Sequence, residues 1–148
     1  MRSRAAADLA PLLLRLAIGA SFVASGLDKA AAPERAAALF RSLDLPSPEM
    51  LGPAVGVIEL VGGLALLTGL LTRVVSVAFG VEMAIVLAVI RGPDVLAARS
   101  LVDAFFAIRI EVILGLAAVA LALIGSGRFG LDATLARFRR PAGAPDRG

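Results

Sequence analysis

The sequence predicts an all-α fold, an antiparallel bundle of four transmembrane helices with a short amphipathic helix at the membrane interface between the first and second. Three observations lead to this fold. Hydrophobic residues make up 59% of the 148 residues, whereas soluble domains hold roughly 45–50%. The apolar residues form four stretches, each close to the ~20 residues needed to cross a bilayer. Spanning segments without closed sheets must be helices, because lipid cannot satisfy free backbone groups.

The four predicted helices cover about residues 9–27, 51–71, 74–90 and 104–124. Together they place a single membrane domain over residues 1–135. The first stretch follows Arg2 and Arg4 and has some features of a cleaved signal peptide. Arg15 inside the stretch, and an apolar run longer than a typical signal core, favour an uncleaved transmembrane helix.

The connecting segments also have readable patterns. Between helices one and two, Pro33 suits the first turn of a helix, and apolar residues recur at helical spacing at Ala36, Leu39, Phe40 and Leu43. We therefore expect a short amphipathic helix on the membrane surface. Only three residues, 71–73, join helices two and three, so these two helices should be adjacent and antiparallel. Residues 136–148 are basic and are expected to be a disordered cytoplasmic tail.

Composition excludes several classes of function. The chain has no Cys and no His, which rules out disulfides, thiol relays, iron–sulfur and His- or Cys-ligated haem centres and ordinary zinc sites. We predict no metal site and no covalent cofactor. The net charge of +3 sits mostly in loops and tails, where membrane topology explains it better than nucleic-acid binding does.

Orientation follows from the distribution of basic residues. The N-terminus, the 71–73 loop and the tail carry eight Arg, and the other two loops carry five Lys or Arg. Cytoplasmic loops are the richer in Lys and Arg. With four spans, both termini are therefore expected in the cytoplasm.

Five ionisable residues fall inside the predicted helices: Arg15, Glu59, Glu82, Arg109 and Glu111. Each would cost about 2.5–3.5 kcal/mol at the centre of a membrane helix, so we expect them to pair with one another. Counting 1.5 Å per residue gives two layers of charge. The outer layer holds Glu59, Arg109 and Glu111, and the inner layer holds Arg15 and Glu82. Two bases and three acids leave one carboxyl to spare.

The residues around Glu59 predict that it points into the bundle. Gly52, Gly56, Glu59 and Gly63 share one face of a helix, and small residues allow close approach of a second backbone. Arg109 and Glu111 lie about 200° apart around their helix, so they cannot serve one partner equally well.

Two interpretations of these charges remain open at this level. They could form a structural network that fixes helix order, or they could line a cavity for a ligand, a quinone headgroup or a proton. For Lys29, next to Asp28 at the outer end of helix one, an interfacial position is the simpler expectation.

The runs "LLLRLAIGASFVASGLDKA", "GVIELVGGLALLTGLLTR" and "RIEVILGLAAVALALIGSGRFGLD" resemble the DoxX family of small four-helix bacterial membrane proteins. The likeness covers about residues 12–135. It implies as signature residues Arg15, Gly26, Lys29, Glu59, Arg109, Glu111, Arg128 and Asp132. The resemblance also implies a link to quinone-dependent membrane oxidoreductases.

The expected function is therefore that of an accessory or quinone-associated subunit of a membrane redox assembly, working with redox partner proteins or as a homo-oligomer in the bacterial inner membrane. The alternative is a small transporter that uses the spare carboxyl to relay protons or recognise a solute. A stand-alone enzyme is the least favoured reading, because the chain offers no His- or Cys-based nucleophile.

Overall fold

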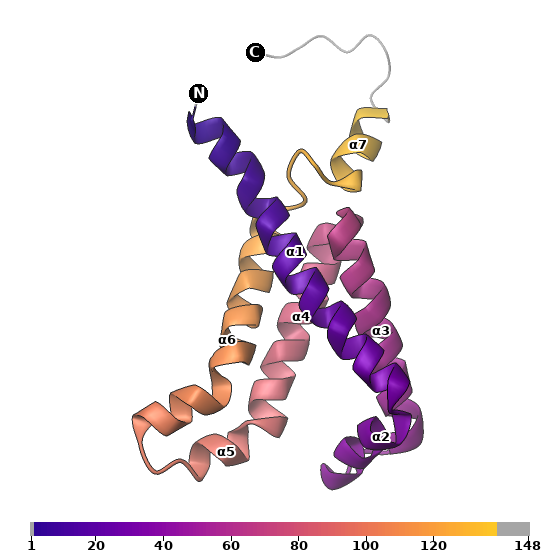
Figure 1. Ribbon diagram of the computed structural model, residues 1–148, viewed down its shortest axis with the longest axis vertical. Helices are drawn as coiled ribbons and strands as arrows, with labels where there is room; N and C mark the ends of the chain where they lie inside the picture. The colour runs from indigo at the N-terminus through magenta and orange to yellow at the C-terminus, as the bar shows by residue number, and fades with distance from the viewer. Residues whose placement is uncertain (1, 139–148) are drawn as a thin grey trace.

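The computed structural model describes residues 2–138, with side chains described from residue 9 onward. The secondary structure of this part of the chain is entirely helical, with no strand, which confirms the predicted fold class (Figure 1). The elements in order are α1 (Arg2–Ala31), α2 (Pro33–Ser42), α3 (Pro48–Thr68), α4 (Thr72–Ile85), the π-helical segment η1 (Val86–Ile90), α5 (Gly92–Leu96), α6 (Leu101–Ile124) and α7 (Leu131–Phe138).

Within the described residues, four helical segments are long and apolar enough to cross a membrane: Leu9–Ala31, Pro48–Thr68, Thr72–Ile90 and Leu101–Ile124. Each overlaps one of the four predicted stretches. Large apolar side chains such as Leu13, Val61 and Leu116 are more than half exposed around the bundle. Apolar surface on this scale is typical of a membrane-facing protein, so the multi-pass membrane prediction is confirmed.

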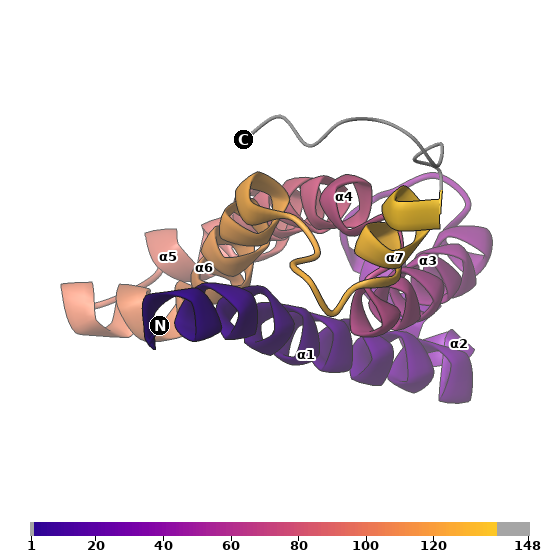
Figure 2. The same ribbon diagram turned by 90° about the horizontal axis from the view of Figure 1, so that it is seen from above.

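The spans are arranged as two helix pairs, with α1 packed along α3 and α4 packed along α6. Figure 2 looks from the end where α7 lies and shows α1 along one side of the molecule and α4 along the other. We call this end the α7 end and the opposite one the α2–α5 end. The two pairs diverge toward the α2–α5 end (Figure 1). Helices α3 and α4, predicted to be neighbours, make far fewer contacts than either pair does.

The core that joins the two pairs is small. Ile18 and Phe22 of α1 and Leu66 of α3 meet Phe79 of α4 and Leu121 of α6. The rings of Phe22 and Phe79 stack with their centroids 3.5 Å apart. Because the pairs are held together here and diverge beyond it, space opens between them at the α2–α5 end.

Glycine allows α1 and α3 to pack closely. A Cβ added at Gly26 would lie 2.6 Å from the carbonyl oxygen of Gly56, and one at Gly63 would lie 2.8 Å from that of Gly19. Backbone contacts this close leave no room for any larger residue. The predicted face of Gly52, Gly56, Glu59 and Gly63 is indeed the buried face of α3.

The interfacial helix is confirmed as α2, which starts at Pro33 and buries Ala36 and Ala37 against α3. At the other end, α7 runs to Phe138, beyond the domain boundary predicted at residue 135. The remainder of the predicted tail, 139–148, lies outside the described residues.

Candidate functional site

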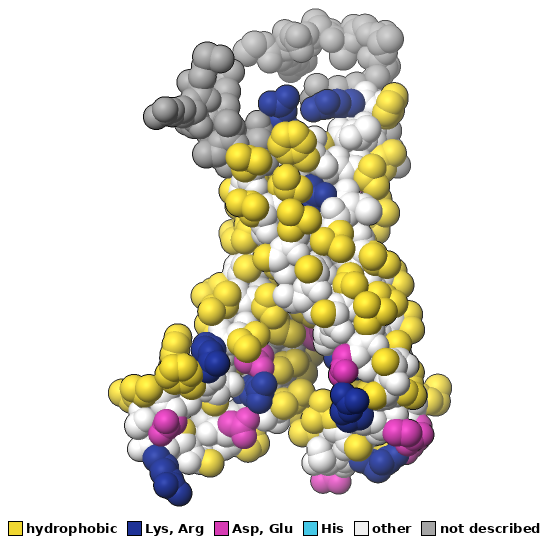
Figure 3. Space-filling model, viewed as in Figure 1, with side chains coloured by type: hydrophobic (Ala, Val, Ile, Leu, Met, Phe, Trp, Pro, Cys, Tyr) yellow, Lys and Arg dark blue, Asp and Glu magenta, His cyan; other side chains and the backbone are white. Residues whose placement is uncertain are grey.

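A cavity of about 550 Å³ lies between the two helix pairs at the α2–α5 end. The space-filling view shows the molecule hollowed there between two lobes (Figure 3). All four paired helices, α1, α3, α4 and α6, contribute lining residues, as do α2 and η1. The lining is mostly aliphatic. Six polar or charged side chains interrupt it: Ser25, Lys29, Glu59, Glu82, Arg91 and Glu111.

Lys29 and Glu59 form a buried ion pair between α1 and α3. The ammonium donates to both carboxylate oxygens of Glu59, at 2.8 and 2.7 Å, and to the Ser25 hydroxyl at 2.8 Å. The side chain of Glu59 is only 5% exposed and that of Lys29 is 19% exposed. Ser25 and Lys29 are one helical turn apart, so they project on the same side of α1. Glu59 is thus neutralised inside the bundle, as its glycine-rich face predicted.

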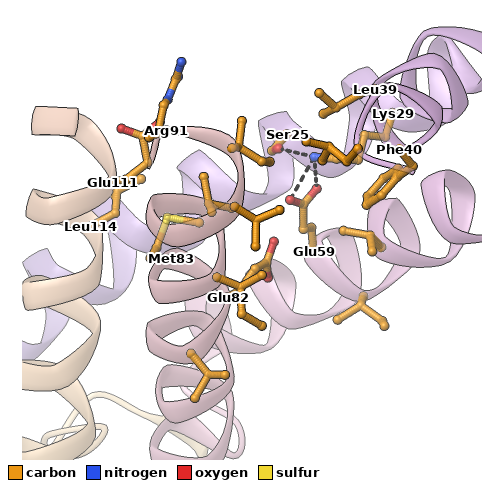
Figure 4. Close-up of a pocket in the computed structure, with 18 of the residues that line it drawn as sticks. Ser25, Lys29, Leu39, Phe40, Glu59, Glu82, Met83, Arg91, Glu111 and Leu114 are labelled. Carbon is orange, nitrogen blue, oxygen red and sulfur yellow. Dashed lines mark hydrogen bonds and ion pairs between the residues drawn. The ribbon is translucent and has the colours of Figure 1, made fainter. Parts of the chain in front are cut away.

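Glu82 joins this group from α4. Its carboxyl lines the same cavity as Glu59 and points toward the Glu59 carboxylate (Figure 4). Glu59 and Glu82 each lie near the middle of a membrane span, so the two acids meet at mid-depth. We call Ser25, Lys29, Glu59 and Glu82 the Lys29 cluster. This cluster contains one ammonium and two carboxyls, so one carboxyl has no basic partner in it. That matches the spare carboxyl expected from the count of charges.

A second ion pair lies on the α4/α6 side of the cavity. Arg91, which follows η1, donates from Nε to Glu111 of α6 at 2.7 Å and from NH1 to Asp94 at 3.4 Å. The hydrogen bond that Arg91 donates to Glu111 raises the pKa of the Arg91 guanidinium, so this residue stays charged. Glu111 is buried, whereas the Arg91 side chain is 39% exposed. The pair therefore belongs to the rim of the cavity.

The expected pairing of Arg109 with Glu59 is wrong. The guanidinium of Arg109 stays on its own helix, where NH1 donates to the Phe106 carbonyl at 2.6 Å and the group lies 4.6 Å from the centre of the Phe106 ring. Arg109 is half-buried and Glu111 is buried, so the two residues do face different directions as predicted. The base that pairs with Glu59 is Lys29, which we had expected at the interface.

The expected pairing of Arg15 with Glu82 is also wrong. Arg15 is 2% exposed and donates to the carbonyls of Leu66 and Leu67, each at 2.9 Å, and of Ser126 at 3.1 Å. The last carbonyls of a helix have no intrahelical donor, and a cation suits the negative end of the helix dipole. Arg15 therefore caps the C-terminus of α3.

Asp132 performs the complementary task at the neighbouring helix end. Its carboxylate accepts hydrogen bonds from the backbone N–H groups of Leu71 and Thr72, at 2.8 and 2.9 Å, where α4 begins. In turn the Asp132 N–H donates to the carbonyl of Gly69 at 2.9 Å. Arg15 and Asp132 thus stabilise the turn between α3 and α4. They lie outside the cavity lining, and their role here is structural.

Two of the six polar lining residues, Ser25 and Arg91, were not predicted as site residues from the sequence. Ser25 carried a usable signal, because it lies four residues before Lys29 and so shares its face of the helix. Arg91 was counted as a loop charge, and its contact with Glu111 depends on the path of η1, which hydrophobic periodicity does not reveal. Among the described residues, no group of three or more acidic side chains is arranged to hold a metal ion.

The four apolar helices define a multi-pass membrane protein. The cavity between them is large enough for a small ligand and contains a cluster of ionisable side chains. The DoxX family matches residues 10–92, more than half of the chain. The protein belongs to the DoxX family. The matched region includes α1 to η1 and therefore every member of the Lys29 cluster.

One curated relative is the "Putative oxidoreductase CatD" of Bacillus subtilis (strain 168), which is 36% identical over 76 residues. That alignment covers 51% of this chain and 55% of the relative, so the chain spans about half the length of the curated relative it matches. No solved structure gives a significant match.

Proposed function

We propose that this DoxX-family protein binds a quinone in the cavity between its helix pairs and acts as an accessory subunit of a membrane redox assembly. The observation that carries the proposal is the cavity itself, which is largely apolar and has the Lys29 cluster at mid-membrane depth. Small-molecule sites typically measure about 300–1,000 Å³ and combine an apolar lining with a few convergent polar groups.

The dimensions and chemistry of the cavity suit an amphipathic ligand. A quinone has a flat ring with two polar oxygens and an apolar tail. The oxygens can lie at the Lys29 cluster, while the tail follows aliphatic lining residues such as Ile58, Val86 and Leu114. Because the chain lacks Cys and His, electrons would pass between the quinone and a partner protein. The name of the relative, an oxidoreductase, supports a link to redox chemistry.

The bacterial inner membrane, with both termini in the cytoplasm, is part of this proposal. The start of α1 and α7 lie at the same end of the molecule (Figure 1), and the basic residues favour that end as the cytoplasmic one. The cavity would then open toward the outer face. Redox partners, or a second copy of the chain, would bind around the lipid-facing surface.

Proton or solute transport is the second candidate, and Glu82 is the observation that favours it. Its carboxyl faces the cavity (Figure 4), and none of the ion pairs within residues 9–138 includes it. Transport of a proton or an ion would also need ionisable groups that continue toward the α7 end. The next buried charge in that direction, Arg15, is instead committed to helix carbonyls. This geometry favours a binding site over a pathway.

A thermal-shift experiment tests the quinone proposal. Short-tail ubiquinone and menaquinone analogues should raise the melting temperature of the purified protein in detergent, since a ligand at 100 times its Kd stabilises by about 2.7 kcal/mol. Ala78→Phe, on the exposed lining face of α4, should abolish the shift by filling the cavity. Ala84→Phe, an exposed position of α4 outside the lining, is the matched control. No shift for the wild type, or an equal shift for Ala78→Phe, would refute the proposal.

A further inference from the structure

The hydrogen-bonding groups of the Lys29 cluster determine which form of a ligand it can hold. An ammonium has three N–H donors and no acceptor. Those of Lys29 are directed at Glu59 Oε1, Glu59 Oε2 and Ser25 Oγ, all within 2.7–2.8 Å. The strongest donor in the cavity is therefore fully used within the protein.

The carboxyl groups, by contrast, retain accepting capacity. Each carboxylate oxygen has two lone pairs, and each Glu59 oxygen receives one hydrogen bond from Lys29. Glu82 presents its carboxyl to the same space from the opposite helix pair (Figure 4). A protonated carboxyl keeps a carbonyl oxygen that accepts hydrogen bonds, and the Glu82 carboxyl points toward that of Glu59 (Figure 4). In both protonation states, acceptor atoms face the cavity.

Few donors remain to balance these acceptors. The hydroxyl hydrogen of Ser25 is one. Arg91 has further N–H groups, but its Nε and NH1 are directed to Glu111 and Asp94 at the partly exposed rim. The part of the cavity at the Lys29 cluster is therefore rich in acceptors, and with both acids ionised it carries one excess negative charge.

We propose that the cavity selects the reduced ligand, a quinol, over the oxidised quinone. This inference rests on the proposed function and specifies the ligand for the same site. A quinol has two hydroxyl donors, which match the carboxyl oxygens of Glu82 and Glu59. A quinone offers only carbonyl acceptors, which would face carboxyl oxygens without a hydrogen between them. Buried acceptors left without a donor are costly, so we expect the quinol to bind about tenfold more tightly or better.

Anaerobic titration of the purified protein with one short-tail naphthoquinone analogue, in its oxidised and chemically reduced forms, tests this selectivity. We expect a lower Kd for the reduced form. Glu82→Gln, which replaces an acceptor with an amide that also donates, should reduce the preference severalfold. Arg109→Gln, at a residue outside the lining, should preserve it.

The outcomes separate the two proposals. Equal binding of both forms, or tighter binding of the oxidised form, overturns the quinol assignment and leaves quinone binding intact. Binding of neither form overturns the proposed function and the selectivity with it. An unchanged preference in a folded Glu82→Gln protein overturns the role of Glu82. The wild-type comparison decides the main question even if that variant does not fold.

Discussion

At the scale of single residues, the ion pair between Lys29 and Glu59 places a neutralised carboxylate inside the bundle. Glu59 is buried on its glycine face as expected, but its partner is Lys29 rather than Arg109. Depth along a helix can be counted from sequence, whereas the direction in which a long basic side chain extends cannot. Lys29 extends inward because α1 crosses close to α3, and that crossing depends on backbone packing.

Removal of the Lys29 charge should destabilise the protein more than removal of the Arg109 charge. Lys29→Met leaves the Glu59 carboxylate buried without its cation, which costs about 3 kcal/mol or more. The melting temperature in detergent should therefore fall clearly for Lys29→Met and only slightly for Arg109→Gln, whose side chain is half-buried on its own helix.

The double variant Lys29→Met/Glu59→Gln provides the internal control for this prediction. It removes both charges and should recover part of the loss. If Lys29→Met melts with the wild type, or if Arg109→Gln is the more damaging change, the ion pair does not stabilise the bundle as described.

At the scale of helices, length and composition were sufficient to find all four spans, because a bilayer imposes a minimum length on any apolar helix. Helix α2 was found instead from Pro33 and the helical spacing of its apolar residues. The same information did not reveal which helices pair. The short 71–73 connection suggested α3 beside α4, yet the closest packing is between α1 and α3. This pairing depends on glycines of α1 that contact glycines of α3. A sequence pattern shows that a helix has a glycine face, but it does not show which other helix packs against that face.

Helix packing at these glycines can be tested directly. Gly63→Val would place side-chain atoms against the backbone of Gly19 and Val23, where even a Cβ comes within 2.8 Å. The cost should exceed the roughly 1–3 kcal/mol of ordinary overpacking, because backbone atoms cannot move aside. We expect little folded protein in size-exclusion profiles of the detergent extract.

Gly80→Ala is the matched control for this prediction, because the nearest atom to its added Cβ is 3.8 Å away. Alanine favours helix over glycine by about 1 kcal/mol, so this variant should fold as well as the wild type or better. A monodisperse Gly63→Val protein with wild-type melting would contradict the close packing of α1 on α3.

At the scale of the whole molecule, two helix pairs that are joined at one end and apart at the other make the cavity an outcome of the architecture. No local sequence motif predicted the cavity, because its lining residues are spread along the chain from Ser25 to Leu114. The buried charges could be predicted from the sequence. Which of them line the cavity, and which, like Arg15, stabilise helix ends, depends on the arrangement of the two helix pairs.

The proposed orientation has a direct test, aided by the absence of Cys from the chain. Leu96→Cys on α5 and Leu135→Cys on α7 introduce single thiols at exposed positions near opposite ends. With both termini in the cytoplasm, a membrane-impermeant maleimide should label Leu96→Cys in intact bacterial cells and Leu135→Cys only after lysis. The reverse pattern would invert the topology and turn the cavity toward the cytoplasm.

The contact between Arg15 and Ser126 has a consequence for how the chain matures. These residues are separated by 111 positions in sequence, and Asp132 reaches back 60 positions to Thr72. Helix α1 therefore enters the bilayer long before the groups that complete its polar contacts have been synthesised. During that interval the Arg15 guanidinium lacks its contact with Ser126, so a chain truncated before residue 126 would leave this cation without one of its three carbonyl acceptors.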